Sequence, residues 1–138
     1  MKSKSKTYKI WFYSEKKLEE ISEKLLENGL VKSFEYDYEN VYEWIEAQSD
    51  DLQIEFNFSR QHSYEREFEQ NSIEQIKANL EKPITVLFMY DGDEPSDEIV
   101  EEFASSLSQI LQCSVFLGNI NYLGGDNYEY IKTKEISY

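Results

Sequence analysis

Residues 31–47 read VKSFEYDYENVYEWIEA, and this stretch decides the fold class because its side chains alternate with the period of a β-strand. Across 34–39, aromatic side chains alternate with carboxylates. A second run, 41–47, follows Asn40, and a third run, 51–59, follows the turn QSDD. The three runs predict an antiparallel meander of three strands.

A strand and a helix are expected before this meander. The apolar stretch YKIWFY, residues 8–13, predicts a strand, and Ser14 is placed to cap the helix that follows it. Asn28 and Gly29 end that helix. Three apolar residues recur at helical spacing and predict its buried face, namely Leu18, Ile21 and Leu25.

Two more helices are expected after the meander. Ser72 and Gln75 form a capping-box pattern that predicts a short helix, which Pro83 ends. The apolar run ITVLFMY, residues 84–90, predicts a central strand covered on both faces, and Ser96 is placed to cap a longer helix. The buried stripe of this longer helix is predicted to consist of Ile99, Phe103, Leu107, Ile110 and Leu111.

The end of the chain predicts the edge of a sheet. Residues 113–123 are mostly apolar and indicate one or two strands, and residues 127–137 indicate a final strand. Lys132 and Lys134 lie in this final strand, where lysines suit a protected edge.

The length of 138 residues suits one domain, and 21 aromatic residues can supply its core. We expect a flexible basic tail at 1–7 and a single α+β domain at 8–138, with a mixed or largely antiparallel sheet and about three helices. The order strand, helix, strands recurs in 8–58 and 84–138. It indicates either a βαββ pseudo-repeat or common α+β construction.

The negative charge of the chain is concentrated in blocks. The formal net charge is −14, and no basic residue lies between Lys32 and Arg60 or between Lys82 and Lys132. Such blocks repel nucleic acid and anionic membranes and attract basic partners. We therefore expect a basic protein partner, with no nucleic-acid or membrane binding.

Two acidic patches are the predicted partner-binding surfaces. In the first, carboxylates on alternate positions of a strand share one face, and amphipathic rings lie beside them. The second patch is the acidic loop that follows the predicted central strand. The predicted contact residues are Glu35, Asp37, Glu39, Tyr42, Glu43 and Trp44 in the first patch, and Asp91, Asp93 and Glu94 in the second.

No catalytic or metal-binding pattern is evident in the sequence. His62 is the only histidine and Cys113 the only cysteine, so these residue types cannot complete a zinc site. The loop at 91–98 departs from a calcium-binding loop because Pro95 interrupts the ligand spacing. We expect no enzyme activity, metal or cofactor; an enzyme that uses His62 and the Asp91 region is the alternative.

The N-terminal segment lacks the apolar core of a signal peptide. No apolar run approaches the roughly 20 residues that a membrane-spanning helix requires. A cytoplasmic location is therefore expected.

Size, charge and the segments FEYDYENVYEW (34–44) and YDGDEPSDE (90–98) resemble small acidic immunity proteins of polymorphic-toxin and contact-dependent growth inhibition systems. The resemblance implies a cytoplasmic protein that binds one cognate toxin domain, for example a nuclease, and blocks its active site without catalysis of its own. Two alternatives stay open: a nucleic-acid mimic that inhibits a DNA-binding or restriction enzyme, and a homodimeric adaptor.

Overall fold

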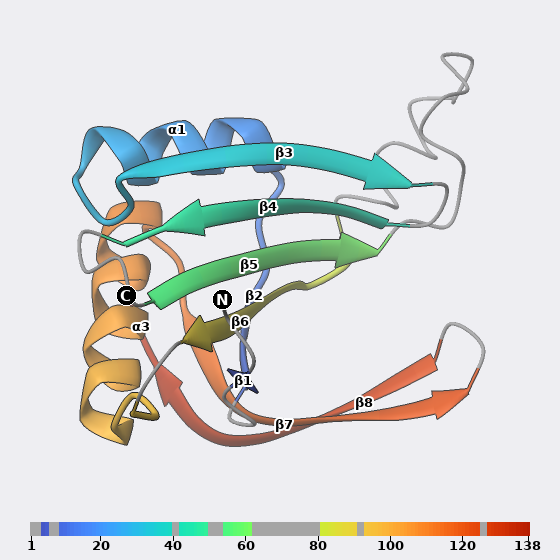
Figure 1. Cartoon of the computed structure of the whole chain (residues 1–138). Helices are drawn as coiled ribbons and strands as arrows, with labels where there is room; N and C mark the ends of the chain where they lie inside the picture. The colour runs from blue at the N-terminus through green and yellow to red at the C-terminus, as the bar shows by residue number, and fades with distance from the viewer. Residues whose placement is uncertain are drawn as a thin grey trace.

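The computed structural model describes residues 4–5, 9–39, 42–49, 54–61, 81–90, 93–124 and 127–138. The described strands and helices are shown in Figure 1. In chain order they are β1 (Lys4–Ser5), β2 (Lys9–Phe12), α1 (Leu18–Glu27), β3 (Ser33–Glu39), β4 (Tyr42–Gln48), β5 (Ile54–Gln61), β6 (Ile84–Tyr90), α3 (Asp97–Leu111), β7 (Val115–Gly124) and β8 (Asn127–Ile136).

The strands form one sheet in the order β3-β4-β5-β6-β2-β7-β8, and β1 pairs with β6. Every described pair of neighbouring strands is antiparallel. We expected an α+β domain with a mixed or largely antiparallel sheet and about three helices, and this expectation is corrected. The fold is a largely sheet α+β fold, with two helices in the part of the chain that the structure describes. The helix expected near Ile73 lies outside the described residues.

The predicted meander is confirmed, because β3 pairs with β4 and β4 pairs with β5 in continuous antiparallel register. The βαββ pseudo-repeat is not reproduced in the sheet. The strands joined by α1, β2 and β3, are separated by β4, β5 and β6, whereas those joined by α3, β6 and β7, are separated by β2 alone. Corresponding strands of the two halves thus occupy different positions.

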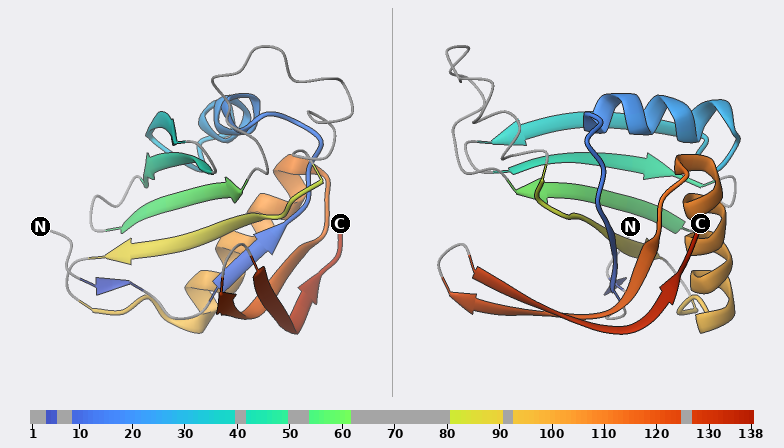
Figure 2. Two further views of the ribbon diagram at one scale, coloured as in Figure 1. Left: turned by 90° about the vertical axis from the view of Figure 1, so that its right-hand side faces the viewer. Right: turned by 180° about the vertical axis from the view of Figure 1, so that it is seen from behind.

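Both helices pack on the same face of the sheet and form the core with it (Figure 2). Phe103 of α3 is the centre of an aromatic cluster. Its ring centroid lies 4.4 Å from that of Phe56 and 5.0 Å from that of Phe88. Burial of several rings in one cluster is a major source of stability for a chain of low mean hydropathy.

The start of α3 confirms one prediction and corrects another. The hydroxyl of Ser96 accepts a hydrogen bond from the N–H of Ile99 at 3.2 Å, as expected for a helix cap. The side chain of Ile99, however, is 45% exposed, and the neighbouring Val100 is fully buried. The helix is turned so that Val100 and Phe103 face the sheet.

The start of α1 also differs from the expectation. Leu18, Ile21 and Leu25 are buried as predicted, but the helix begins after Lys17 without a side-chain cap. The hydroxyl of Ser14 instead accepts a hydrogen bond from the N–H of Lys16, within the connection from β2.

The strand β6 is central, as predicted, but its two faces are not equally covered. Ile84, Val86, Phe88 and Tyr90 are buried, whereas the residues between them are half-buried. At its end β6 pairs with Lys4–Ser5, which belong to the expected tail. None of the described helices has the length and apolar character needed to cross a membrane.

Candidate protein-binding site

The antiparallel register of β3 and β4 assembles an acidic patch on the face of the sheet opposite the helices. Glu35 lies directly across from Glu46, and Asp37 lies directly across from Trp44. The three acidic side chains are exposed, and Trp44 is half-buried. Ile45, which alternates with these residues on β4, is buried in the core. We call Glu35, Asp37, Glu46 and Trp44 the acidic face.

Two carboxylates directly opposite each other on neighbouring strands destabilise a sheet. Neither β3 nor β4 contains a basic residue that could offset this repulsion. Glu35, Asp37 and Glu46 therefore form a concentrated negative surface beside an indole ring. A cationic group placed between Glu35 and Glu46 would turn this repulsion into attraction.

Glu46 is absent from the residues predicted from the sequence, although it lies in the stretch that defines the first patch. Its position follows from the pairing of Glu39 with Tyr42, which leaves a two-residue connection between β3 and β4. Two-residue connections are the commonest in hairpins. Assigning this connection to Asn40 and Val41 would have placed Glu35 opposite Glu46.

The expectation for Glu43 is corrected, because its side chain points to the opposite face and is only 4% exposed. Its Oε1 accepts a hydrogen bond from the hydroxyl of Tyr36 at 2.9 Å. Alternation along a strand explains the difference, since Glu43 cannot share a face with its neighbour Trp44. Glu43 is therefore part of the core and is not available to a partner.

Glu43 is opposite Arg60 of β5, which is only 1% exposed. The Nη2 of Arg60 donates hydrogen bonds to the carbonyl oxygens of Ser14 and Lys16, at 2.8 and 3.0 Å. Burial lowers the pKa of the guanidinium, and the negative charge of Glu43 opposes this shift. Arg60 therefore ties β5 to the connection between β2 and α1.

The second predicted patch is described only in part. Asp93 and Glu94 are exposed, and they lie in the connection from β6 to α3. This connection leads to the helix layer, on the other side of the sheet from the acidic face. The structure therefore does not bring these residues together with Glu35 and Asp37.

The remaining predicted residues cannot be placed in either patch. Glu39 and Tyr42 pair through their backbones at the end of the β3–β4 hairpin, and their side chains lie outside the described part of the chain. Asp91 and His62 also lie outside the described residues.

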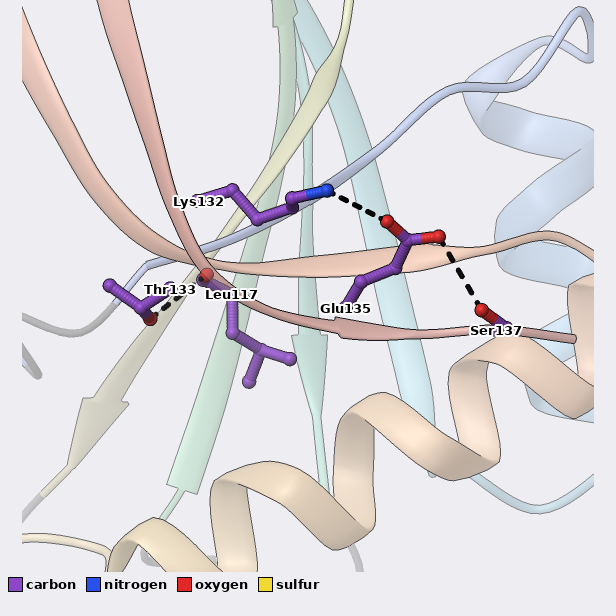
Figure 3. Close-up of polar contacts among 5 residues, drawn as sticks. All are labelled: Leu117, Lys132, Thr133, Glu135 and Ser137. Atoms are coloured by element: carbon purple, nitrogen blue, oxygen red, sulfur yellow. Dashed lines mark hydrogen bonds and ion pairs between the residues drawn. The ribbon is translucent and has the colours of Figure 1, made fainter.

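The strand β8 is at the other edge of the sheet, as its lysines predicted. Figure 3 shows polar contacts of its side chains. The Nζ of Lys132 lies 2.9 Å from Oε1 of Glu135, and Lys134 forms an ion pair with Glu101 of α3. The hydroxyl of Thr133 donates a hydrogen bond to the carbonyl oxygen of Leu117 at 3.2 Å. Both lysines of β8 are thus paired with carboxylates of the same chain, and their side chains are about half exposed.

The ion pair between Lys132 and Glu135 predicts that the stability of the protein depends on pH. The hydrogen bond and the charge of Lys132 lower the pKa of the Glu135 carboxyl below its ordinary value. The stabilisation is therefore present above the ordinary pKa of a glutamate and is lost as the pH falls through the lowered pKa. In an NMR titration of the side-chain carboxyl, Lys132→Gln should raise the midpoint of Glu135 to the ordinary range. An unchanged midpoint in this variant would contradict the assignment.

The structure defines a class of fold. It is a largely sheet α+β domain with helices on one face of the sheet and exposed carboxylates on the other. Comparison of the chain with protein-family models, curated proteins and solved structures finds no match. Among the described residues, no group of three or more His, Cys, Asp or Glu side chains could hold a metal ion.

Proposed function

We propose that the chain is a non-catalytic acidic binding protein of the cytoplasm, an immunity protein that binds and neutralises a basic cognate toxin domain. The observation that carries the proposal is the pairing of Glu35 with Glu46 on an exposed face without a basic residue on either strand. This arrangement costs stability in the free protein and is relieved when a cationic surface binds. A toxin domain that acts on nucleic acid has such a surface.

Charge and the aromatic ring have different roles in this complex. Exposed carboxylates accelerate the diffusional encounter with a basic partner, and ionic strength weakens this effect. Trp44 lies directly opposite Asp37 and supplies apolar area next to the charges. Aromatic residues at the centre of an interface slow dissociation because they are removed from water on binding.

Neutralising the acidic face should slow association. We expect Glu35→Gln, Asp37→Asn and Glu46→Gln together to lower the association rate constant with the partner roughly tenfold or more at low salt. The difference from the unmodified protein should shrink as salt is added. The partner is first obtained by co-purification with the tagged chain, and rates are then measured by stopped-flow or surface plasmon resonance.

A matched control for this experiment is available on α1. Glu20, Glu23 and Glu27 are exposed on this helix, and their replacement by glutamine changes the net charge by the same amount. Equal slowing by both sets would show that only net charge matters and would contradict a specific acidic face. Inhibition of several unrelated nucleases by the chain would instead indicate a nucleic-acid mimic.

A further inference from the structure

The two outer strands of the sheet are β3 and β8, and they differ in how they resist further pairing. β8 contains two lysines, and its register with β7 shifts between Leu117 and Gly118. β3 pairs with β4 from Ser33 to Glu39 without a register shift and contains no lysine, proline or glycine. Bulges, prolines and charged side chains, especially lysine, are the devices by which edge strands avoid added strands, and of these β3 has only carboxylates.

We propose that β3 binds an extended segment of the partner by strand addition, and that this segment has lysine or arginine at alternate positions. The inference rests on the proposed function, because it specifies how the basic partner is held. In strand addition the backbone hydrogen bonds provide affinity and the alternate side chains provide specificity.

The charges of β3 oppose addition of a second copy of this chain. The side chains of Ser33, Glu35 and Asp37 lie on the face of β3 that points away from the helices, which we call the outer face. An antiparallel self-pairing centred on Tyr36 would place Glu35 opposite Asp37 of the second copy. Pairings centred on Glu35 or Asp37 would place that residue opposite itself. These face-matched registers have the longest overlaps, and all of them oppose like charges.

The same alternation defines the side chains that an added strand would need. Its residues on the outer face would lie beside Glu35 and Asp37, where lysine or arginine gives opposite charges. Its intervening residues would lie beside Phe34 and Tyr36, which are half-buried and pack against the core. The favoured segment therefore alternates basic residues with β-branched or aromatic ones.

The backbone of β3 contains a bond that strand addition would exchange. The N–H of Tyr38 donates a hydrogen bond to Oδ1 of Asp37 at 2.8 Å. A carbonyl of an added strand that accepted this N–H would release the Asp37 carboxylate. The released carboxylate could then pair with a basic side chain of the same added strand.

The test uses the full chain and a synthetic peptide of alternating lysine and valine, as long as β3 and blocked at both ends. We expect this peptide to bind and to protect alternate backbone amides of β3 from hydrogen exchange. Two further peptides have N-methyl groups on one or the other set of alternate amides. One of them should bind about tenfold more weakly or worse, because it cannot donate to β3. A glutamate–valine peptide should not bind.

Protein variants complete the test. Glu35→Lys with Asp37→Lys should abolish peptide binding, whereas Glu20→Lys with Glu23→Lys on α1 makes the same change in net charge and should retain it. Circular dichroism establishes that each variant is folded. Because the probe is the lysine–valine peptide, this test does not require the natural partner to be known.

Several results would overturn strand addition. They are failure of the lysine–valine peptide to bind, equal binding of both N-methylated peptides, protection of β8 in place of β3, and self-association through β3. If a natural partner still binds in a salt-dependent way that requires Glu35 and Asp37, the proposed function stands and only strand addition fails. Loss of that dependence would overturn the proposed function itself.

Discussion

Replacing Glu43 by glutamine is expected to destabilise the protein by about 3 kcal/mol, because it leaves the buried guanidinium of Arg60 without its opposite charge. Glu43 and Arg60 are register partners, with 4% and 1% of their surfaces exposed. Glutamine keeps the volume and an oxygen that can accept the hydrogen bond from Tyr36. The expected loss is therefore mainly the loss of charge compensation, since arginine stays protonated in proteins.

The size of this effect can be separated from that of the neighbouring hydrogen bond. Tyr36→Phe removes the hydroxyl that donates to Glu43 at 2.9 Å but keeps both charges, and it should cost about 1 kcal/mol. The double variant Glu43→Leu with Arg60→Met removes both charges and should recover part of the loss, because the carbonyl oxygens of Ser14 and Lys16 also lose their donor. Urea denaturation measures all three variants. A cost for Glu43→Gln no greater than that for Tyr36→Phe would show that the charge pair contributes little.

Replacing Gly118 by alanine should destabilise the protein by about 3 kcal/mol, because there is no space for a methyl group. A Cβ atom at this position would lie 2.0 Å from the carbonyl oxygen of Ile131 and 3.0 Å from the backbone nitrogen of Thr133. Both are backbone atoms of β8 at the register shift of the β7–β8 pair. The strands would have to separate locally to accept the substitution.

Gly29 provides a control that isolates this steric effect from backbone conformation. Its φ is +76°, and a Cβ atom there would have no neighbour within 4 Å. Gly29→Ala should therefore cost only about 1 kcal/mol, from the left-handed backbone alone. Denaturation midpoints of the two variants should differ clearly. Equal midpoints would contradict the close approach of β7 and β8 at Gly118.

Local patterns in the sequence were sufficient to predict those structural elements that depend on neighbouring residues. The alternation in 34–39 and 51–59 predicted β3 and β5, and the Ser96 hydroxyl caps α3 as its position indicated. Lys132 and Lys134 indicated an edge strand because lysine opposes further pairing, and β8 is at the edge.

The same patterns failed where packing between distant segments determines which residues are buried and which strands become neighbours. Ile99 and Val100 are adjacent apolar residues, and either could begin the buried stripe of α3. The contacts of Phe103 with Phe56 and Phe88 orient the helix so that Val100 is buried. The recurring order of strands and helices indicated either a pseudo-repeat or common α+β construction, and it does not specify which strands become neighbours.

For the acidic face, the sequence by itself determined that β3 is negative on alternate positions and that no base lies between Lys32 and Arg60. Only the tertiary structure placed Glu46 opposite Glu35, put β3 at an open end of the sheet order, and buried Glu43 with Arg60. The physical reason is that side-chain alternation is a property of each strand alone. Register, strand order and burial depend on contacts between segments that are far apart in the chain.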